Sequence, residues 1–332
     1  MMKKVFIAVL LASLSTLIGL CPFCSVLFAK DEFPTAPITL LLGYPPGGNT
    51  DVQARALAEL AKKHLGQPVL INNMPGMGGS LMMDYLARQK PDGYTVAFMA
   101  ASTVVINPFI EKVNYSYKDF TYIHAFGLQL HNLAVRSDSP WKTFNQFIDY
   151  AKKNPGKIKY ATYSPISTTS LVLRIIAKQK QIDWIHVPYK GDGPAITAVL
   201  GGHADALSVS SSVLPYVKSG DFRVLAVFLK DRSSELPDVP TLKELGFNLP
   251  PLSNWSTYTG IVGPKGLTGV PLAKLEAAFS KSSQDPSFLK VMQKFACPVL
   301  NVPSKEYERE IAEAYQELKG IIPPLIKEIQ EK

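Results

Sequence analysis

The chain has 332 residues, of which 46% are hydrophobic and 19% are charged. This composition excludes a disordered or fibrous chain and leaves room for one large domain or two ordinary ones. The three cysteines are too few for a disulfide scaffold, and no Cys/His cluster has the spacing of a zinc site. The formal net charge is +8, but no arginine-rich run accompanies it, so nucleic acid is not an expected partner.

Residues 1–29 have the pattern of a secretory signal peptide. Lys3 and Lys4 give a positive start, and an uncharged stretch follows up to Ala29. We expect cleavage after Ala29 and a periplasmic location for the mature protein. The apolar stretch is also long enough to span a bilayer, so an uncleaved N-terminal anchor is the alternative. Pro22 within the stretch favours cleavage.

Residues 37–99 alternate between strand and helix patterns. The apolar run 37–43 predicts a strand buried on both faces. Thr50-Asp-Val-Gln53 matches a capping box, which opens a helix that Gly66 ends. A strand at 69–72, a helix at 80–87 and a strand at 94–99 follow. This order predicts a parallel sheet covered by helices.

The same alternation begins again after residue 130. It predicts strands at 133–135, 159–163, 185–187, 206–209 and 224–228, and helices at 143–153, 168–179 and 193–201. After a proline-rich stretch at 237–251, we expect a strand at 258–262 and two or three helices within 271–331. Two α/β units of similar size predict a bilobed α/β protein.

The most informative segment joins the first predicted strand to its helix. It reads Gly43-Tyr-Pro-Pro-Gly-Gly-Asn-Thr-Asp51. Open parallel sheets bind ligands at this edge, and glycines there let backbone N–H groups approach an anion. No Lys follows the glycines, which excludes a phosphate-binding P-loop. The alternative is a simple tight turn at Gly47-Gly48, and Asp51 in the first helical turn would compete with a bound anion.

Two further polar loops lie at the ends of predicted strands. One is Asn73–Ser80, in which Gly76-x-Gly78 lacks the full spacing of a dinucleotide site. The other is Ser164–Ser170, at the matching position of the second unit. Its hydroxyls can cap a helix or donate to a ligand, and capping is the simpler interpretation for Ser167 and Thr168 taken singly.

Motifs for catalysis are missing from the sequence. There is no G-x-S-x-G elbow and no H-E-x-x-H helix, and the five histidines are scattered without ligand spacing. Asp183, Asp192 and Asp205 fall at the ends of predicted elements, where turn chemistry explains them. We therefore expect no catalytic residue, no metal and no cofactor.

A series of short motifs runs in order from about residue 34 to residue 264. It includes Pro37-Ile-Thr-Leu40, Pro46-Gly-Gly-Asn-Thr-Asp51, Asn73-Met-Pro-Gly-Met-Gly-Gly79, Lys90-Pro-Asp-Gly-Tyr-Thr95, His186-Val-Pro-Tyr-Lys-Gly191 and Leu236-Pro-Asp-Val-Pro-Thr241. The series resembles the substrate-binding proteins of tripartite tricarboxylate transporters, the Bug or TctC family.

The resemblance implies an α/β, two-domain periplasmic-binding-protein fold (Venus flytrap, type II) with mostly parallel sheets. We expect residues 30–127 with 256–332 to form domain 1, and residues 128–255 to form domain 2. The implied function is an extracytoplasmic receptor that captures a small mono-, di- or tricarboxylate in the interdomain cleft. It would deliver the acid to integral membrane permease subunits, and a monomer is expected.

The family grips a ligand carboxylate with the β-α loops of both domains, usually without an Arg clamp. Carried over to this sequence, the ligand-binding residues are Tyr44, Pro46, Gly47, Gly48, Asn49, Thr50, Asp51, Asn73, Ala101, Ser102, Thr103, Ser164, Ser167, Thr168, Thr169, Tyr189, Ser208 and Ser210. The second loop of the family is commonly Gly-x-Gly-Ser, whereas this chain has Ser164-Pro-Ile-Ser167. Side-chain hydroxyls are therefore expected to make the contacts of domain 2.

Two alternatives remain open from the sequence. The same binding protein could hand its closed form to a sensor kinase instead of a permease. The other alternative is an exported α/β enzyme that acts on an organic acid, which would show turnover and a titrating acid–base pair in the cleft.

Overall fold

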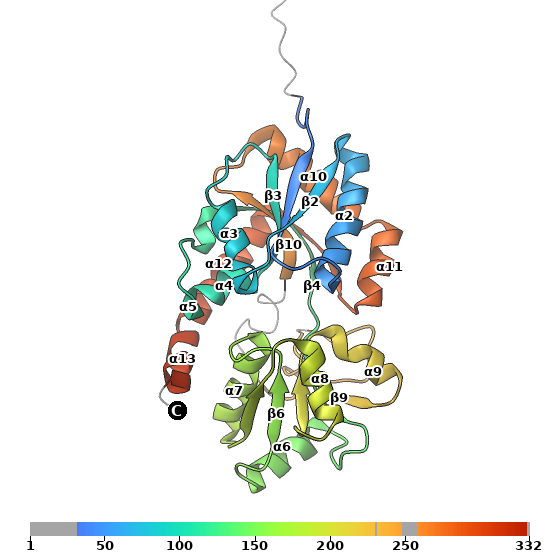
Figure 1. The fold of residues 1–332 in the computed structure, drawn as a ribbon, viewed down its shortest axis with the longest axis vertical. Helices are drawn as coiled ribbons and strands as arrows, with labels where there is room; N and C mark the ends of the chain where they lie inside the picture. The colour runs from blue at the N-terminus through green and yellow to red at the C-terminus, as the bar shows by residue number, and fades with distance from the viewer. Residues whose placement is uncertain (1–31, 230, 248–257, 331–332) are drawn as a thin grey trace, which may run out of the picture. The chain divides into compact units, whose positions relative to one another are not determined.

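Two β-sheets organise the computed structural model, which describes residues 32–229, 231–247 and 258–330 (Figure 1). The expected signal peptide, with Cys21 and Cys24, lies outside the described residues. The N-terminal and C-terminal parts of the chain, blue to teal and orange to red in Figure 1, build one sheet together with its helices. The middle of the chain, green to yellow, builds the other.

The first sheet has six strands in the order β11-β4-β10-β3-β1-β2. Their bounds are β1 (Ile38–Leu42), β2 (Val69–Asn73), β3 (Thr95–Ala100), β4 (Phe120–Leu128), β10 (Tyr258–Pro264) and β11 (Val299–Pro303). Residues 40–42 of β1, which lies between β3 and β2, are fully buried, as the apolar run predicts.

Helices cover this first sheet. They are α2 (Asn49–Leu65), α3 (Ser80–Leu86), α4 (Ser102–Val105), α5 (Asn107–Ile110), α10 (Gly269–Ser283), α11 (Pro286–Lys294), α12 (Ser304–Lys319) and α13 (Ile322–Gln330). Helices α10 and α11 pack against α2, whereas α12 packs against α4 and β4 (Figure 1). The last helix, α13, reaches α7 of the second sheet.

The second sheet has five strands in the order β7-β6-β8-β5-β9. Its strands are β5 (Asn132–Arg136), β6 (Lys159–Thr162), β7 (Ile185–Pro188), β8 (Ala206–Ser208) and β9 (Phe222–Val227). The helices of this part are α6 (Phe144–Lys153), α7 (Thr168–Lys180), α8 (Asp192–Leu200) and α9 (Leu214–Lys218).

Both sheets are mixed, which corrects the expectation of mostly parallel sheets. Strands β1, β2 and β3 pair in parallel, and so do β6, β7 and β8. Strand β10 instead runs antiparallel to both β3 and β4, and β5 runs antiparallel to β8 and β9. The reason is connectivity, since only a strand joined to its neighbour through a crossover helix is bound to run parallel to it.

The α/β class itself is confirmed by this architecture of two sheets with their helices. The first sheet draws its strands from residues 38–128 and 258–303, and the second from residues 132–227. Residues 34–332 form one compact unit, so the domain boundaries at 127/128 and 255/256 stay a prediction.

The start of α2 differs from the expected capping box. The helix begins at Asn49, and its N-cap is Gly48, which offers no side chain. Thr50 therefore lies inside the first turn, and the carboxylate of Asp51 accepts a hydrogen bond from the N–H of Gly47 instead.

Over the described residues, every helix is too short or too polar to traverse a lipid bilayer. The same part of the chain brings no three His, Cys, Asp or Glu side chains together as a metal site would require.

Candidate ligand-binding site

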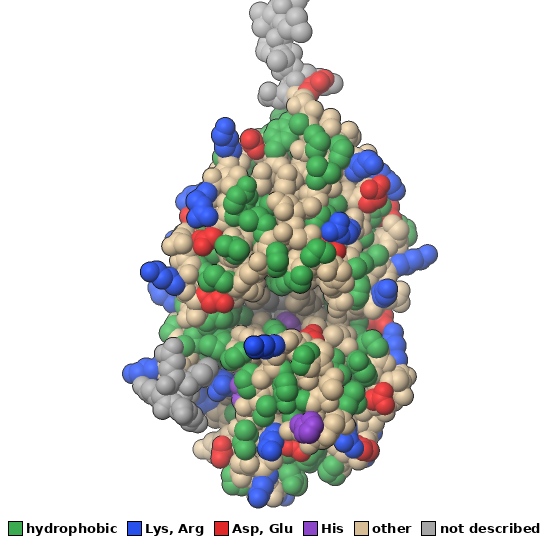
Figure 2. All heavy atoms as spheres, viewed as in Figure 1, with side chains coloured by type: hydrophobic (Ala, Val, Ile, Leu, Met, Phe, Trp, Pro, Cys, Tyr) green, Lys and Arg blue, Asp and Glu red, His purple; other side chains and the backbone are tan. Residues whose placement is uncertain are grey.

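A pocket of about 430 Å³ lies where strand-end loops of both sheets meet. This volume suits a small ligand, and the carboxyl ends of strands are where such folds bind them. The pocket is lined by Tyr44, Gly78, Ser102, Ile106, Asn107, Ile110, Glu111, Gln129, His131, Tyr163, Ser164, Ile166, Ser167, Thr168, Gly191, Asp192 and Ser210. Figure 2 shows a hollow in the surface, with acidic and histidine colours inside it and a basic side chain on its lower rim.

All three polar loops predicted at strand ends contribute to the wall of the pocket, through residues such as Tyr44, Gly78 and Ser164. The predicted ligand-binding residues on it are Tyr44, Ser102, Ser164, Ser167, Thr168 and Ser210. The others, which the wall does not include, are Pro46, Gly47, Gly48, Asn49, Thr50, Asp51, Asn73, Ala101, Thr103, Thr169, Tyr189 and Ser208. Ligand contact by any of these residues stays a prediction.

Asp51 and Asn73 brace the first loop. Asp51 is 3% exposed, and its carboxylate accepts two bonds from Arg55, from Nε at 2.8 Å and from Nη2 at 3.0 Å. Asn73 Nδ2 donates to Asp51 Oδ1 at 3.0 Å and to the carbonyl of Tyr44 at 2.9 Å. These bonds, that of Arg55 foremost, lower the pKa of Asp51 to about 2. The two residues thereby fix the backbone from which Tyr44 reaches the pocket.

Several predicted hydroxyls are already bonded inside the protein. Thr103 Oγ1 donates to the carbonyl of Ala100 at 2.8 Å, and Ser208 Oγ donates to the carbonyl of Asn132 at 2.7 Å. Both residues are almost fully buried. Their hydrogen bonds stabilise the strand ends that carry the pocket loops.

The N-terminus of α7 faces the pocket with a cluster of hydroxyls. Ser167 is the N-cap and forms a capping box with Ser170, in which each side chain accepts from the backbone N–H of the other. Ser167 and Thr168 are nearly buried and line the pocket. The predicted role of Ser167 as a helix cap is therefore confirmed, and the same residue also lies on the pocket wall.

Two tyrosines supply neutral hydroxyls to the pocket. Burial raises the pKa of Tyr44 to about 12. Burial, followed by the negative charge of Asp192, raises the pKa of Tyr163 above its usual range. Both phenols therefore keep their protons at neutral pH and can donate hydrogen bonds.

The pocket residues that sequence reasoning missed include Glu111, His131 and Asp192. His131 is 3% exposed, its ring stacks on Tyr163 with centroids 6.5 Å apart, and burial lowers its pKa to about 4. Asp192, explained from the sequence as a turn residue, is the first residue of α8 and lies on the wall. Its position directly after the predicted strand at 185–187 was the signal that could have found it.

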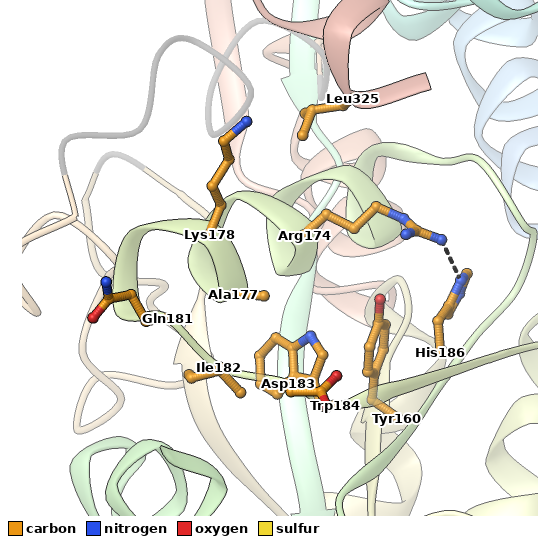
Figure 3. A pocket seen from close by; sticks show the side chains of 10 residues that line it. All are labelled: Tyr160, Arg174, Ala177, Lys178, Gln181, Ile182, Asp183, Trp184, His186 and Leu325. Carbon is orange, nitrogen blue, oxygen red and sulfur yellow. Dashed lines mark hydrogen bonds between the residues drawn. The ribbon is translucent and has the colours of Figure 1, made fainter. Parts of the chain in front are cut away.

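A second pocket of about 520 Å³ lies along α7 (Figure 3). Arg174 Nη2 lies 3.1 Å from His186 Nδ1, and His186 Nε2 lies 2.7 Å from Thr162 Oγ1. The Tyr160 ring stacks on His186 with centroids 4.8 Å apart. Arg174 and His186 on the wall of this pocket thus bond to each other, and the wall comes from the second sheet and its helix α7, with Leu325 of α13. The first pocket, which joins loops of both sheets, is the better candidate.

Comparison with known proteins assigns the family. A family model described as the tripartite tricarboxylate transporter family receptor, TctC, matches residues 53–327. The chain belongs to this receptor family. The resemblance seen in the sequence motifs is thereby confirmed.

Individual relatives agree with the assignment. A UPF0065 protein from the gbd 5′ region of Cupriavidus necator is 38% identical over 296 residues, which is 89% of each chain. The crystal structure of a TctC solute-binding protein from Polaromonas superposes with a TM-score of 0.77 at 28% identity, covering 87% of this chain and 99% of that one. MatC from Rhodopseudomonas palustris, solved with bound malate, shares the fold with a TM-score of 0.68 at 24% identity, covering 87% and 100%.

Proposed function

We propose that this TctC-family receptor captures a small carboxylate-bearing organic acid in the pocket of about 430 Å³ and delivers it to membrane permease subunits. The observation that carries the proposal is the convergence of polar strand-end loops from both sheets on one pocket. Since MatC shares the fold alone, its malate does not identify the ligand here.

The carboxylate is assigned to the N-terminal end of α7. Ser167 and Thr168 line the pocket there, Ser164 is in the loop before them, and the helix dipole favours a negative charge at that end. Tyr163, which stays protonated, lies on the same wall. Micromolar affinity needs about 8 kcal/mol, and charge-assisted hydrogen bonds contribute about 1.5–3 kcal/mol each. Three or four such bonds are sufficient, without a cationic side chain.

The location and mode of action form part of the same proposal. We propose that the signal peptide at residues 1–29 directs the protein to the periplasm, where it acts as a monomeric binding protein without catalysis. Family membership supports a receptor. In the sequence, the absence of a catalytic motif agrees with this.

A thermal-shift screen of the purified protein tests the ligand class. Mono-, di- and tricarboxylates form the panel, with sugars and amines as controls. Ligand at a hundred times its dissociation constant adds about 2.7 kcal/mol to stability, which is a readily measured rise in Tm. A rise with acids alone supports the proposal. An unresponsive protein that also releases no acid on denaturation, as judged by mass spectrometry, overturns it.

Two further measurements separate the receptor from its alternatives. Nuclear magnetic resonance of the acid after long incubation should show unchanged ligand, whereas a new product would indicate an enzyme. Uptake of labelled acid by cells should require both the receptor and its permease. Uptake that is independent of the receptor would contradict delivery and favour a sensing role.

A further inference from the structure

The charges in the pocket restrict the ligand beyond the presence of a carboxylate, and this step rests on the proposed function. Among the pocket-lining residues that the structure describes, Glu111 and Asp192 are acidic and none is Lys or Arg. An acid that enters this pocket therefore meets two carboxylates and no fixed positive charge on the wall. A ligand with one negative charge fits such a wall better than one with two or three.

Asp192 is held in place at the N-terminus of α8. Its Oδ2 accepts hydrogen bonds from Ser210 Oγ and, at 2.6 Å, from Ser212 Oγ. Neither bond uses Oδ1. Because the Ser210 hydroxyl gives its proton to Asp192, that hydroxyl is not a donor for a ligand carboxylate. Asp192 also occupies the end of α8 that would otherwise attract an anion.

The other groups near Asp192 do not neutralise it. His131 lies close enough for the charge of Asp192 to act on its ring, yet burial lowers the pKa of His131 to about 4. The imidazole is therefore neutral at physiological pH. Its Nδ1 is buried and has no hydrogen-bond partner within the described residues. Neutral Tyr163 stacks on it.

The part of the wall contributed by α5 and its two flanking residues carries the second acid and an apolar patch. Glu111 Oε2 accepts a hydrogen bond from Ser80 Oγ at 3.1 Å, and Ser80 Oγ accepts one from Asn107 at 2.8 Å. Ile106 and Ile110 line the pocket beside Glu111. These isoleucines offer apolar surface to the body of the ligand, between its two ends.

We infer that the ligand is an organic acid with one carboxylate and, at its far end, a hydrogen-bond donor that binds Asp192. The donor is a hydroxyl, an amide N–H or an ammonium group. The carboxylate binds at the start of α7, where the helix dipole favours a negative charge and Ser167 and Thr168 line the pocket. Fully ionised α,ω-dicarboxylates bind less tightly, because their second carboxylate would meet Asp192.

Acids of equal length that differ only at one end test this inference. Titration calorimetry compares glutarate with glutaramate, 5-hydroxyvalerate and 5-aminovalerate, and adipate with the corresponding six-carbon acids. The best donor-ended acid should bind about tenfold or more tightly than the matched dicarboxylate, as the loss of one charge-assisted hydrogen bond implies. In the Asp192→Asn variant, the ratio of the affinity for the donor-ended acid to that for the dicarboxylate should become smaller or fall below one.

Asp149→Asn is the matched control. It removes an equal charge from the exposed surface of α6, outside the pocket lining, and should keep the wild-type preference. A dicarboxylate that binds the wild-type protein as tightly as every donor-ended partner overturns the inference while leaving the proposed function intact. An unchanged preference in folded Asp192→Asn also overturns it. If no acid of either kind binds, the proposed function itself fails. If Asp192→Asn does not fold, the wild-type comparison alone decides.

Discussion

Asn73 Nδ2 donates a hydrogen bond to Asp51 Oδ1 at 3.0 Å, which ties the end of β2 to the first turn of α2. The two residues are 22 positions apart in the sequence, and Asn73 is the last residue of β2. Arg55 closes the arrangement by donating to both oxygens of Asp51. The bonds among Asp51, Arg55 and Asn73 thus stabilise the conformation of the loop at residues 43–51.

Asp51→Asn should lower the free energy of unfolding at neutral pH by about 1–2 kcal/mol, because it removes one partner of a buried charge-assisted network. Urea unfolding measures the change. Glu59→Gln on the same helix is the control, since its pairing with Lys62 is exposed and 3.8 Å long. That exposed variant should stay within about 0.5 kcal/mol of wild type. Equal losses in both variants would contradict a structural role for Asp51.

The same network predicts a pH dependence. The pKa of Asp51 is lowered to about 2 in the folded protein, so its stabilisation is present above the unfolded value of about 4 and is lost as the pH falls toward 2. The stability difference between wild type and Asp51→Asn should narrow over that interval. A difference that stays constant down to pH 2 would exclude the lowered pKa.

Ser167→Ala should weaken ligand binding and also destabilise the protein. Ser167 caps α7 and lines the pocket, and loss of such a cap costs about 1 kcal/mol. Thr143→Ala is a matched control, because Thr143 caps α6 by accepting from the N–H of Gln146 and is outside the pocket lining. Both variants should lose similar stability in urea, and only Ser167→Ala should lose affinity in calorimetry. Equal affinities in the two variants would remove Ser167 from the binding site.

The strand and helix pattern of the β-α-β units could be predicted from the sequence because it is local. The apolar run at β1 can be recognised from residues only a few positions apart. The same is true of the helical spacing of apolar residues in α2. Strand β4 was not predicted from the sequence. The two helices before it, α4 and α5, have four residues each, which is too short to show a helical hydrophobic period, so no alternation of strand and helix could be recognised there. Strand β11 was missed because it is a half-exposed edge strand without a continuous apolar run.

Of the candidate site, only residues in the strand-end loops could be predicted from the sequence. Tyr44 and Ser167 lie in glycine- and serine-rich segments that signal their position at strand ends. Glu111 and His131 carry no local signal of this kind, and only the fold brings them together with Asp192 from three separate parts of the chain. The braced role of Asp51 was also invisible, because Asn73 meets it only after β1 and β2 have paired.

His186 should make the protein sensitive to mild acid. Arg174 can only donate, so His186 Nδ1 accepts from it, and Nε2 then donates to Thr162, whose hydroxyl donates to the carbonyl of Ser164 at 2.8 Å. Burial, followed by the charge of Arg174, lowers the pKa of His186 from 6.5 to about 4. Its neutral form is therefore required by the fold.

Because the folded pKa lies below the unfolded one, the contribution of His186 to stability is complete above pH 6.5 and is lost as the pH falls toward 4. A shift of this size corresponds to about 3 kcal/mol, and the partial exposure of the ring to solvent makes the contribution of His186 smaller than that. His186→Gln should flatten this part of the stability profile measured in urea. The ring signals of His186 in nuclear magnetic resonance should not titrate above pH 5, and a midpoint near 6.5 would refute the assignment.

Gly43→Ala should separate the two glycine-rich loops of the first sheet. A Cβ at Gly43 would lie 2.7 Å from the Cα of Gly79, which is backbone and cannot turn aside as a side chain would. Overpacking of this kind costs about 1–3 kcal/mol, and the displaced loop carries Tyr44 at the pocket wall. We expect lower stability in urea and weaker ligand binding. Gly320→Ala is the control, because its backbone has right-handed helical angles that alanine adopts and the nearest atom to an added Cβ, the carbonyl oxygen of Glu317, lies at an ordinary contact distance of 3.6 Å. If Gly43→Ala were as stable as that control and bound ligand with wild-type affinity, the close approach of the loops would not be needed for the pocket.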